Sequence, residues 1–316
     1  MPERDSPTLR AWRPDGGTPA TLLRWLMTEW CNYRCPYCPQ THDRRADKGH
    51  GMTAHAFDNF PVEQWLEAFD RHFATTRLSL VLTGGEPMVD RRRMLGFLNH
   101  LSARALVECI RIDTNLWWRP EQFAGLDPAK IILMCTFHPS QVEEAVFIER
   151  LQAVQRYGLS IGMVNYVMDD DNGTQFAERA KLFAGLGVTL HPNPLWNRRG
   201  DYSEAGLALV RRAIPEHDYR YRTGLESPKG KPCHFPSLSY EMDATGKITP
   251  GCLYDRTGSF FDPHLPAGPE AAVPCPFSKC VCLDKYSFLD GFERNVSTNP
   301  LGEYGKALVR KQAALF

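Results

Sequence analysis

Short apolar segments alternate with amphipathic segments along residues 20–210. The apolar segments favour strands, and the amphipathic ones carry apolar residues at helical spacing. We expect strands over 21–28, 77–82, 107–112, 130–136, 160–167 and 188–191, and helices over 59–74, 90–104, 141–157 and 174–186. This order predicts right-handed crossovers, a parallel sheet and an α/β fold, either a partial barrel or an open sheet. In both architectures the chemistry belongs in the loops after the carboxyl ends of the strands.

The composition limits the classes of protein that this chain can be. Its 37 Lys and Arg balance 37 Asp and Glu, which disfavours a nucleic-acid polymer as partner. With 43% hydrophobic residues the chain is globular, and 316 residues suffice for one large domain or two ordinary ones. No stretch reaches the roughly 18–20 apolar residues of a membrane span, and residues 1–13 lack the apolar part of a secretory signal. We therefore expect a cytoplasmic protein without a membrane partner.

The ten cysteines divide into a group of three, two isolated residues and a late group of five. In a reducing compartment they are expected to be metal ligands, catalysts or core residues rather than disulfides. The isolated Cys109 and Cys135 lie in apolar runs, where a cysteine behaves as a small buried hydrophobe. The two groups therefore carry the functional prediction.

The first group follows the first predicted strand as Cys31-Asn-Tyr-Arg-Cys35-Pro-Tyr-Cys38. Three thiolates do not complete a tetrahedral zinc site. A cubane iron–sulfur cluster held by three cysteines instead leaves one iron open to an outside ligand. The alternative is a zinc knuckle completed by His42 or a distant cysteine.

The second predicted strand ends in Thr83-Gly84-Gly85-Glu86-Pro87. Two consecutive glycines allow a ligand to approach the backbone closely, and the carboxylate beside them can accept hydrogen bonds from an ammonium group. An ordinary glycine-rich turn is the alternative for this segment taken by itself.

With these two motifs one βα unit apart, the chain resembles a radical S-adenosylmethionine (radical SAM) enzyme over residues 20–210. The resemblance implies a partial (β/α)6 TIM-like barrel in which Cys31, Cys35 and Cys38 bind a [4Fe-4S] cluster. SAM would chelate the fourth iron, and its one-electron cleavage would yield a 5′-deoxyadenosyl radical that abstracts hydrogen from the substrate. A low-potential electron donor such as flavodoxin or ferredoxin is implied as a partner.

The same resemblance implies further site residues at the strand ends. Gly84, Gly85 and Glu86 would contact the methionyl part of SAM, and Tyr37 its adenine. The remaining SAM-binding candidates are Thr114, Asn115, Thr136 and Asn165; the segment at Thr136 departs from the Ser/Asp pattern often seen for ribose contacts. His138 and His191 are each a substrate ligand, a proton-transfer group or a hydrogen-bonded core histidine.

The late cysteines are Cys233, Cys252, Cys275, Cys280 and Cys282. Segments 240–242 and 247–249 around a Gly246 turn predict a hairpin that brings Cys233 and Cys252 together. Beside the radical SAM motifs, this region resembles a Twitch domain, the shorter relative of the SPASM extension, which implies one auxiliary [4Fe-4S] cluster. Cys233, Cys252 and Cys282 are the expected ligands, and Cys275 and Cys280 compete for the fourth position. A zinc site is the alternative.

These interpretations divide the chain into an N-terminal segment (1–19), a barrel (20–210), a linker (211–232) and an α+β cysteine-rich domain (233–316). With 30 residues before Cys31, we expect no separate peptide-binding domain. The segment 308–316 lacks the Gly-Gly-x-Arg tail of a molybdopterin-type cyclase, which disfavours that activity.

Aromatic and arginine residues follow the third and sixth strands, near the predicted mouth of the barrel. They are Trp117, Trp118, Arg119, Trp196, Arg198 and Arg199. Arginine forks suit carboxylate or phosphate and aromatic rings suit a base, so a small anionic or nucleotide-like substrate is expected, with Arg198 and Arg199 as binding residues. The alternative is rim packing and solvated charge.

The auxiliary cluster would accept an electron from the substrate radical or anchor the substrate, giving an oxidation or a rearrangement. One alternative is a radical SAM enzyme that modifies peptides. Alternatives of another class are a non-catalytic iron–sulfur electron carrier and a zinc-binding interaction protein.

Overall fold

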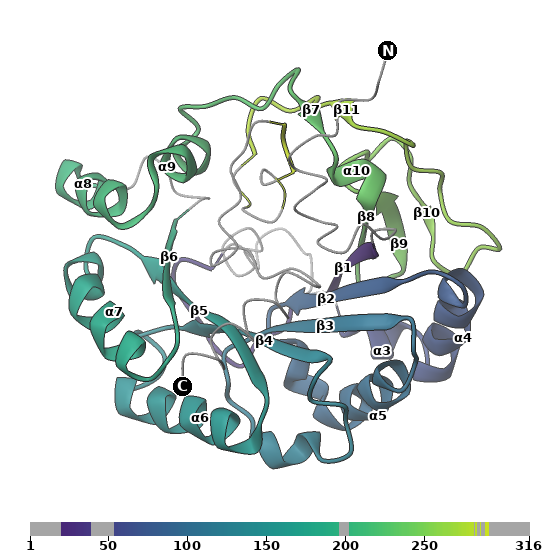
Figure 1. The fold of residues 1–316 in the computed structure, drawn as a ribbon, viewed down its shortest axis with the longest axis horizontal. Helices are drawn as coiled ribbons and strands as arrows, with labels where there is room; N and C mark the ends of the chain where they lie inside the picture. Colours follow the sequence, from purple (N-terminus) through teal and green to yellow (C-terminus); the bar gives the residue numbers. More distant parts are fainter. Residues whose placement is uncertain are drawn as a thin grey trace.

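The computed structural model describes residues 20–38, 54–195, 202–280, 282, 285 and 288–290. Within them, one sheet of nine strands has the order β10-β9-β8-β1-β2-β3-β4-β5-β6. The sheet curves around an interior but does not close, as Figure 1 shows. The α/β fold is therefore a partial barrel, and the open-sheet alternative is excluded.

The six strands expected from the sequence are present and pair in parallel in chain order. They are β1 (Thr21–Thr28), β2 (Leu78–Gly84), β3 (Val107–Thr114), β4 (Ile131–Phe137), β5 (Ser160–Met168) and β6 (Leu190–Pro194). The observed β2 and β3 each extend two residues beyond the predicted end. Strand structure therefore continues to the start of the Gly85 and Asn115 loops.

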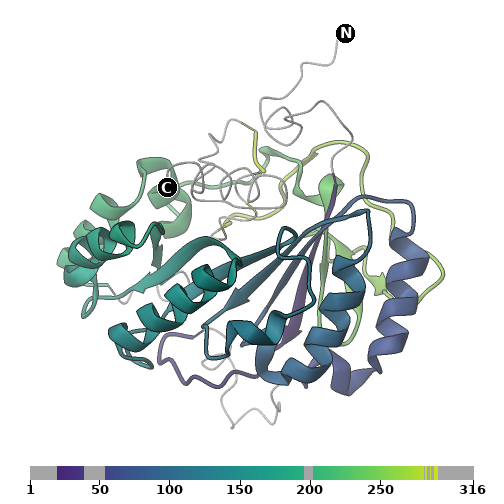
Figure 2. The ribbon, with the colours of Figure 1, turned by 60° about the horizontal axis from the view of Figure 1, so that its bottom comes forward.

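Four helices cover the outer face of this sheet (Figure 2). They are α4 (Val62–Phe73), α5 (Arg91–Ser102), α6 (Glu144–Tyr157) and α7 (Phe176–Gly185). Trp25 of β1 packs its ring 4.4 Å from that of Trp65 and 5.8 Å from that of Phe69, centroid to centroid. Burial of such aromatic surfaces is the main force that holds the helices on the sheet.

Each of the four helices starts one to three residues later than predicted. The helix expected over 59–74 starts at Val62 as α4, after the separate short helix α3 (Ala56–Asn59), because Pro61 between them has no backbone N–H to continue a helix. The helix expected to start at a capping Thr174 starts at Phe176, since residues Gly173–Gln175 form a 3-10 turn, η4. The predicted stop at Gly158 is confirmed by its left-handed φ of 86°.

Alternate side chains of the strands face the interior of the partial barrel, away from the helices. Register places Arg24 of β1, Val81 of β2 and Arg111 of β3 in one row across the sheet. A second row, nearer the carboxyl ends, contains Thr136 of β4, Asn165 of β5 and His191 of β6. The interior therefore carries polar and charged side chains at two levels.

Half of the segment interpreted as a linker is helical. The helix α8 (Glu204–Ala213) extends into it and α9 (Glu216–Thr223) lies inside it. Ser203 caps α8 by accepting a hydrogen bond from the backbone N–H of Gly206. Both helices lie beyond β6 (Figure 1), so this segment adds to the barrel wall.

The predicted hairpin is confirmed as β8 (Ser239–Met242) and β9 (Lys247–Pro250), with Gly246 at a φ of 79° in its turn. The hairpin joins the barrel sheet, because β8 pairs in parallel with β1 and aligns Glu241 with Arg24. β10 (Gly258–Ser259) completes this edge, whereas β7 (Pro232–Cys233) and β11 (Val273–Pro274) form a separate pair. The short helix α10 (Phe235–Leu238) precedes β8. The cysteine-rich region is thus continuous with the barrel.

Among the described residues, no helix has both the length and the apolar character needed to cross a membrane. Cys109 and Cys135 are buried in strands β3 and β4, as expected for core residues.

Candidate active site

The loop after β1 holds Cys31, Cys35 and Cys38. The thiol sulfur of Cys31 accepts a hydrogen bond from the backbone N–H of Tyr33 at 3.3 Å. The backbone N–H of Cys38 donates to the carbonyl of Cys35 at 3.1 Å, which closes the loop into a turn. Cys35 is buried and the other two are partly buried. The loop therefore presents three thiols at the carboxyl edge of the sheet.

The three thiols influence one another electrostatically. Burial, together with the smaller effects of the neighbouring Cys38 and Cys31, raises the pKa of Cys35 to about 12. Burial is also the main cause of the raised pKa of Cys31. Thiols in such surroundings become thiolates when metal coordination replaces their protons. The donor set fits an iron–sulfur cluster.

Across the described ranges, no three His, Cys, Asp or Glu side chains converge as ligands of one metal ion. In a cubane cluster each cysteine binds a different iron, so three ligands need not meet at one point. The spread of Cys31, Cys35 and Cys38 is compatible with that geometry.

The Gly84-Gly85 pair is needed for close packing within the chain itself. A Cβ at Gly85 would lie 2.1 Å from the carbonyl oxygen of Trp30, and one at Gly84 would lie 2.3 Å from that of Thr28. The backbone N–H of Gly85 donates to Thr28 at 2.8 Å, and that of Glu86 donates to Trp30 at 2.9 Å. The glycines thus hold the end of β2 against the start of the cysteine loop.

Glu86 is fully buried, and its carboxylate accepts hydrogen bonds from the chain's own donors. These are the Thr114 hydroxyl at 3.0 Å, the backbone N–H of Asn115 at 2.7 Å and that of Met88 at 3.1 Å. Burial raises the pKa of Glu86 to about 7, and these hydrogen bonds partly oppose the rise. The contacts of Glu86 connect the ends of β2 and β3.

Asn115 links this carboxylate to the cysteine loop. Its side-chain amide donates to the Asn32 oxygen at 2.9 Å and lies 3.7 Å from the Cys31 sulfur. Trp118, expected near the mouth, is buried and donates its indole N–H to Thr114 at 2.9 Å. Trp117 is partly buried and stacks under the Arg91 guanidinium, 4.6 Å from the ring centroid.

Tyr37 and His138 form a contact between the cysteine loop and the end of β4. The Tyr37 hydroxyl lies 2.9 Å from Nδ1 of His138, and the two rings stack at 5.8 Å between centroids. Burial lowers the pKa of His138 to about 4, so the imidazole is neutral near pH 7. His138 therefore acts first as a partner of Tyr37.

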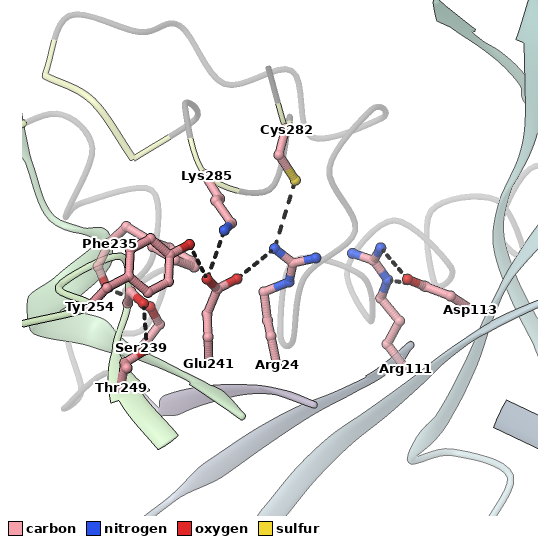
Figure 3. Close-up of polar contacts among 11 residues, drawn as sticks. Arg24, Arg111, Asp113, Phe235, Ser239, Glu241, Thr249, Tyr254, Cys282 and Lys285 are labelled. Carbon is pink, nitrogen blue, oxygen red and sulfur yellow. Dashed lines mark hydrogen bonds and ion pairs between the residues drawn. The ribbon is translucent and has the colours of Figure 1, made fainter. Parts of the chain in front are cut away.

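The five late cysteines gather beside β1 on the interior side. Cys233 and Cys275 are buried in an apolar cluster with Leu22 and Val81 of the barrel, and Cys252 and Cys280 pack against this cluster. The Cys282 sulfur lies 3.7 Å from Nη1 of Arg24, as Figure 3 shows. Burial raises the pKa of Cys252 to about 12. The Cys233 thiol also acts electrostatically on that of Cys252, which agrees with the predicted approach of these two residues.

Known proteins resemble this chain in sequence and in fold. No model of a known protein family matches the chain. Curated relatives named GTP 3′,8-cyclase, from Brucella canis and Brucella ovis, are 26% identical over 257 residues, which span 74% of this chain and 70% of theirs. These relatives are radical SAM enzymes. These similarities support the radical SAM superfamily and an enzymatic activity for this chain.

Solved structures show the same fold. Native anSMEcpe with bound AdoMet matches with a TM-score of 0.55 and 13% identity, covering 77% of this chain and 79% of that one. The same protein with bound AdoMet and Kp18Cys peptide matches with a TM-score of 0.54 and 12% identity, covering 77% and 78%. The TIM-like partial barrel of the radical SAM enzymes is thereby confirmed for this chain.

The second row of interior residues meets helix α9. His191 is buried, and its Nε2 lies 3.3 Å from Nη2 of Arg222, whose other nitrogen contacts Asn193. Thr136 and Asn165 are partly buried in the same row. Arg222 was not predicted as a site residue because it lies in the segment interpreted as a linker. Arg198 and Arg199, with Trp196, lie outside the described residues.

The partial barrel also carries interior charges that were not predicted as site residues. Arg24 and Arg111 lie in predicted strands, and Glu241 lies in the predicted hairpin. A charged residue at an alternate position of an apolar strand is a signal that could have identified them.

Proposed function

We propose that this enzyme holds a [4Fe-4S] cluster on Cys31, Cys35 and Cys38 and cleaves SAM reductively. That cofactor pair supplies a 5′-deoxyadenosyl radical that abstracts hydrogen from a substrate carbon. The observation that carries the proposal is the position of three mutually interacting thiols after β1, directly against the Gly84-Gly85 turn.

The roles proposed for the protein residues follow from their contacts. Glu86 and Thr114 fix the ends of β2 and β3, so that Asn115 can orient Asn32 and Cys31. Tyr37, held by His138, offers an aromatic surface for adenine. The polar edges of Thr136 and Asn165 face the interior, where they would contact the rest of SAM.

We propose a small anionic or nucleotide-like substrate, bound in the interior. The paired His191 and Arg222 support this, because a guanidinium and an imidazole on the inner wall suit phosphate or carboxylate. Relatives that are named for a reaction of GTP support a nucleotide in particular. Arg198 and Arg199 remain predicted contributors to the same binding.

We further propose one auxiliary [4Fe-4S] cluster on four of the five late cysteines, which accepts an electron from the substrate radical or anchors the substrate. The Cys280 thiol interacts electrostatically with those of Cys282, Cys252 and Cys275. Cys280 is therefore the preferred fourth ligand beside Cys233, Cys252 and Cys282.

A peptide substrate is the second candidate. Its support is the fold shared with anSMEcpe, which was solved with a bound peptide. We also propose a cytoplasmic location, and a flavodoxin or ferredoxin as the electron donor, for either substrate.

The test is anaerobic reconstitution followed by iron analysis and detection of 5′-deoxyadenosine. We expect about eight irons per chain and SAM cleavage on reduction. The variant with Cys31, Cys35 and Cys38 all changed to Ala should retain about four irons and form no 5′-deoxyadenosine. SAM cleavage that persists in this variant would refute the main assignment, and about four irons in the fully reconstituted wild type would refute the auxiliary cluster.

Substrate class is tested by incubating the reduced enzyme and SAM with a set of nucleoside triphosphates or with short peptides. Stimulation of 5′-deoxyadenosine formation by a nucleotide, with hydrogen transfer from it, supports the first candidate, and stimulation by a peptide alone supports the second. If Arg222→Met leaves kcat/KM for the nucleotide unchanged, the assigned anion contact is wrong.

A further inference from the structure

A charged cluster lies on the inner wall between the barrel and the late cysteines (Figure 3). Arg24 of β1 is opposite Glu241 of β8 in register, and its Nη1 lies 3.4 Å from Oε1 of Glu241. The same nitrogen lies 3.7 Å from the sulfur of Cys282. One guanidinium of the barrel therefore contacts both a carboxylate and a candidate cluster ligand.

Lys285 reaches the same carboxylate from the other side. Its Nζ lies 2.7 Å from Oε2 of Glu241, and the Tyr254 hydroxyl lies 3.4 Å from that oxygen. The Lys285 ammonium also acts electrostatically on the thiols of Cys252 and Cys280. Figure 3 shows the Arg24 guanidinium between Glu241 and Cys282, and the Lys285 ammonium directed at Glu241.

Among the described side chains, this cluster consists of two cations and one carboxylate. Arg24, Lys285 and Glu241 are 13%, 20% and 21% exposed in that order, so water screens their charges only weakly. The two cations lie beside sulfur atoms of the late group.

The arrangement has a direct consequence for an iron–sulfur cluster at this position. Reduction adds one electron to a cluster that is already negative when its four thiolates are counted. A nearby cation, and an N–H group directed at a ligand sulfur, stabilise the reduced form more than the oxidised form and raise the reduction potential. A carboxylate at the same distance has the opposite effect.

We propose that Arg24 and Lys285 set the reduction potential of the auxiliary cluster, with Glu241 as the opposing charge that also holds both cations in position. The inference rests on the auxiliary cluster of the proposed function. Arg24 is 258 residues from Cys282 in sequence and belongs to β1, the strand that leads into the Cys31 loop. A barrel residue therefore tunes the electron affinity of the cluster in the C-terminal region.

The experiment isolates the auxiliary cluster in the full-length chain by changing Cys31, Cys35 and Cys38 to Ala. A mediated redox titration then follows the one-electron reduction by electron paramagnetic resonance, with dithionite as the external electron source. In this background Arg24→Met and Lys285→Met should each lower the reduction equilibrium constant at least tenfold, which is about 59 mV for one electron. Glu241→Gln should raise it, and Arg24→Lys, which keeps the charge, should change it less than Arg24→Met.

Arg111→Met is the matched control. Arg111 lies in the same row of the sheet as Arg24, and its guanidinium is buried and pairs with Asp113 at 2.7 Å. Its removal takes away the same charge without removing a contact to Cys282, so the potential should remain near that of the parent.

The possible outcomes separate the two proposals. An iron-free parent after reconstitution refutes the auxiliary cluster itself. A parent that holds four irons, with unchanged potentials in Arg24→Met and Lys285→Met or an equal shift in Arg111→Met, refutes the tuning role alone. If either cation variant loses the cluster, Glu241→Gln decides, because an unchanged or lowered potential there contradicts the proposal.

Discussion

The Thr114 hydroxyl oxygen lies 3.0 Å from both carboxylate oxygens of Glu86, in the buried space between the ends of β3 and β2. This contact joins two neighbouring strand ends directly below the cysteine loop. Since Glu86 is fully buried, the loss of a donor leaves a carboxylate that water does not reach.

Thr114→Val should therefore destabilise the fold by about 1–3 kcal/mol, because it keeps the shape of the side chain and removes its hydrogen bonds. Urea unfolding of the metal-free chain measures the change. Thr114→Ser, which retains the hydroxyl, is the control and should lose less. Equal losses in both variants would mean that the methyl group, and not the hydroxyl, is the important part.

Glu86 should make the stability of the metal-free chain depend on pH. Burial raises its pKa to about 7 from an ordinary 4.5, so the folded state holds the proton more tightly than the unfolded chain. Its contribution is fully present below pH 4.5 and is lost as the pH rises to about 7, a difference of roughly 3 kcal/mol. Glu86→Gln should remove this slope. If the free energy of unfolding changes equally with pH in the wild type and in Glu86→Gln between these pH values, the prediction is contradicted.

Gly85→Ala should displace the loop that carries the three cysteines. Its Cβ would overlap the backbone of Trp30 at 2.1 Å, and backbone atoms do not move aside as a flexible side chain does. We expect a loss of about 3 kcal/mol or more in stability, together with loss of the iron bound by the loop. Iron analysis in the background of intact late cysteines checks the second effect.

Gly96→Ala is the matched control for this substitution. Gly96 lies inside α5, and a Cβ there meets no atom within 4 Å. This variant should gain about 0.5–1 kcal/mol because alanine favours the helix. A similar loss in both glycine variants would show that close packing on Trp30 is not the cause.

His138 should not titrate between pH 6 and pH 8. Its pKa is lowered to about 4 by burial, so its contribution to stability is present above the ordinary 6.5 and is lost as the pH falls toward 4. Between pH 6 and pH 8, His138→Gln should change the rate of 5′-deoxyadenosine formation without changing the shape of its pH profile. If a limb of the wild-type profile in this range disappears in the variant, His138 is a proton-transfer group instead.

Cys275 and Cys280 should differ in their effect on iron content. If Cys280 is the fourth ligand, Cys280→Ser reduces the reconstituted enzyme from about eight irons to about four, and Cys275→Ser leaves about eight. The pair is a matched comparison because both positions receive the same substitution. The reverse pattern would assign Cys275 to the cluster. Retention of about eight irons in both variants would refute the assignment of four cysteine ligands to the auxiliary cluster.

The barrel and the position of its cysteine loop could be predicted from the sequence. Strands β1 to β6 are local apolar runs between polar turns, and the Gly246 hairpin depends on a few neighbouring residues, so each is visible in a short window. The helix α9 was missed because its hydrophobic residues show almost no helical periodicity and its segment is rich in charge. Pro61 and the 3-10 turn before α7 shifted two helix starts for local reasons that the apolar pattern does not record.

The sequence by itself determined that three closely spaced cysteines follow the first strand, because that spacing is written in consecutive residues. Only the tertiary structure decided that β8 pairs with β1, that Arg222 reaches His191, and that Arg24 meets Cys282. Each of these contacts joins segments far apart in the chain, and which distant segments meet depends on how the whole sheet curves and packs. Local propensity carries no information on which distant segments meet. Their meeting creates the interior that holds the charges that we propose act on the auxiliary cluster.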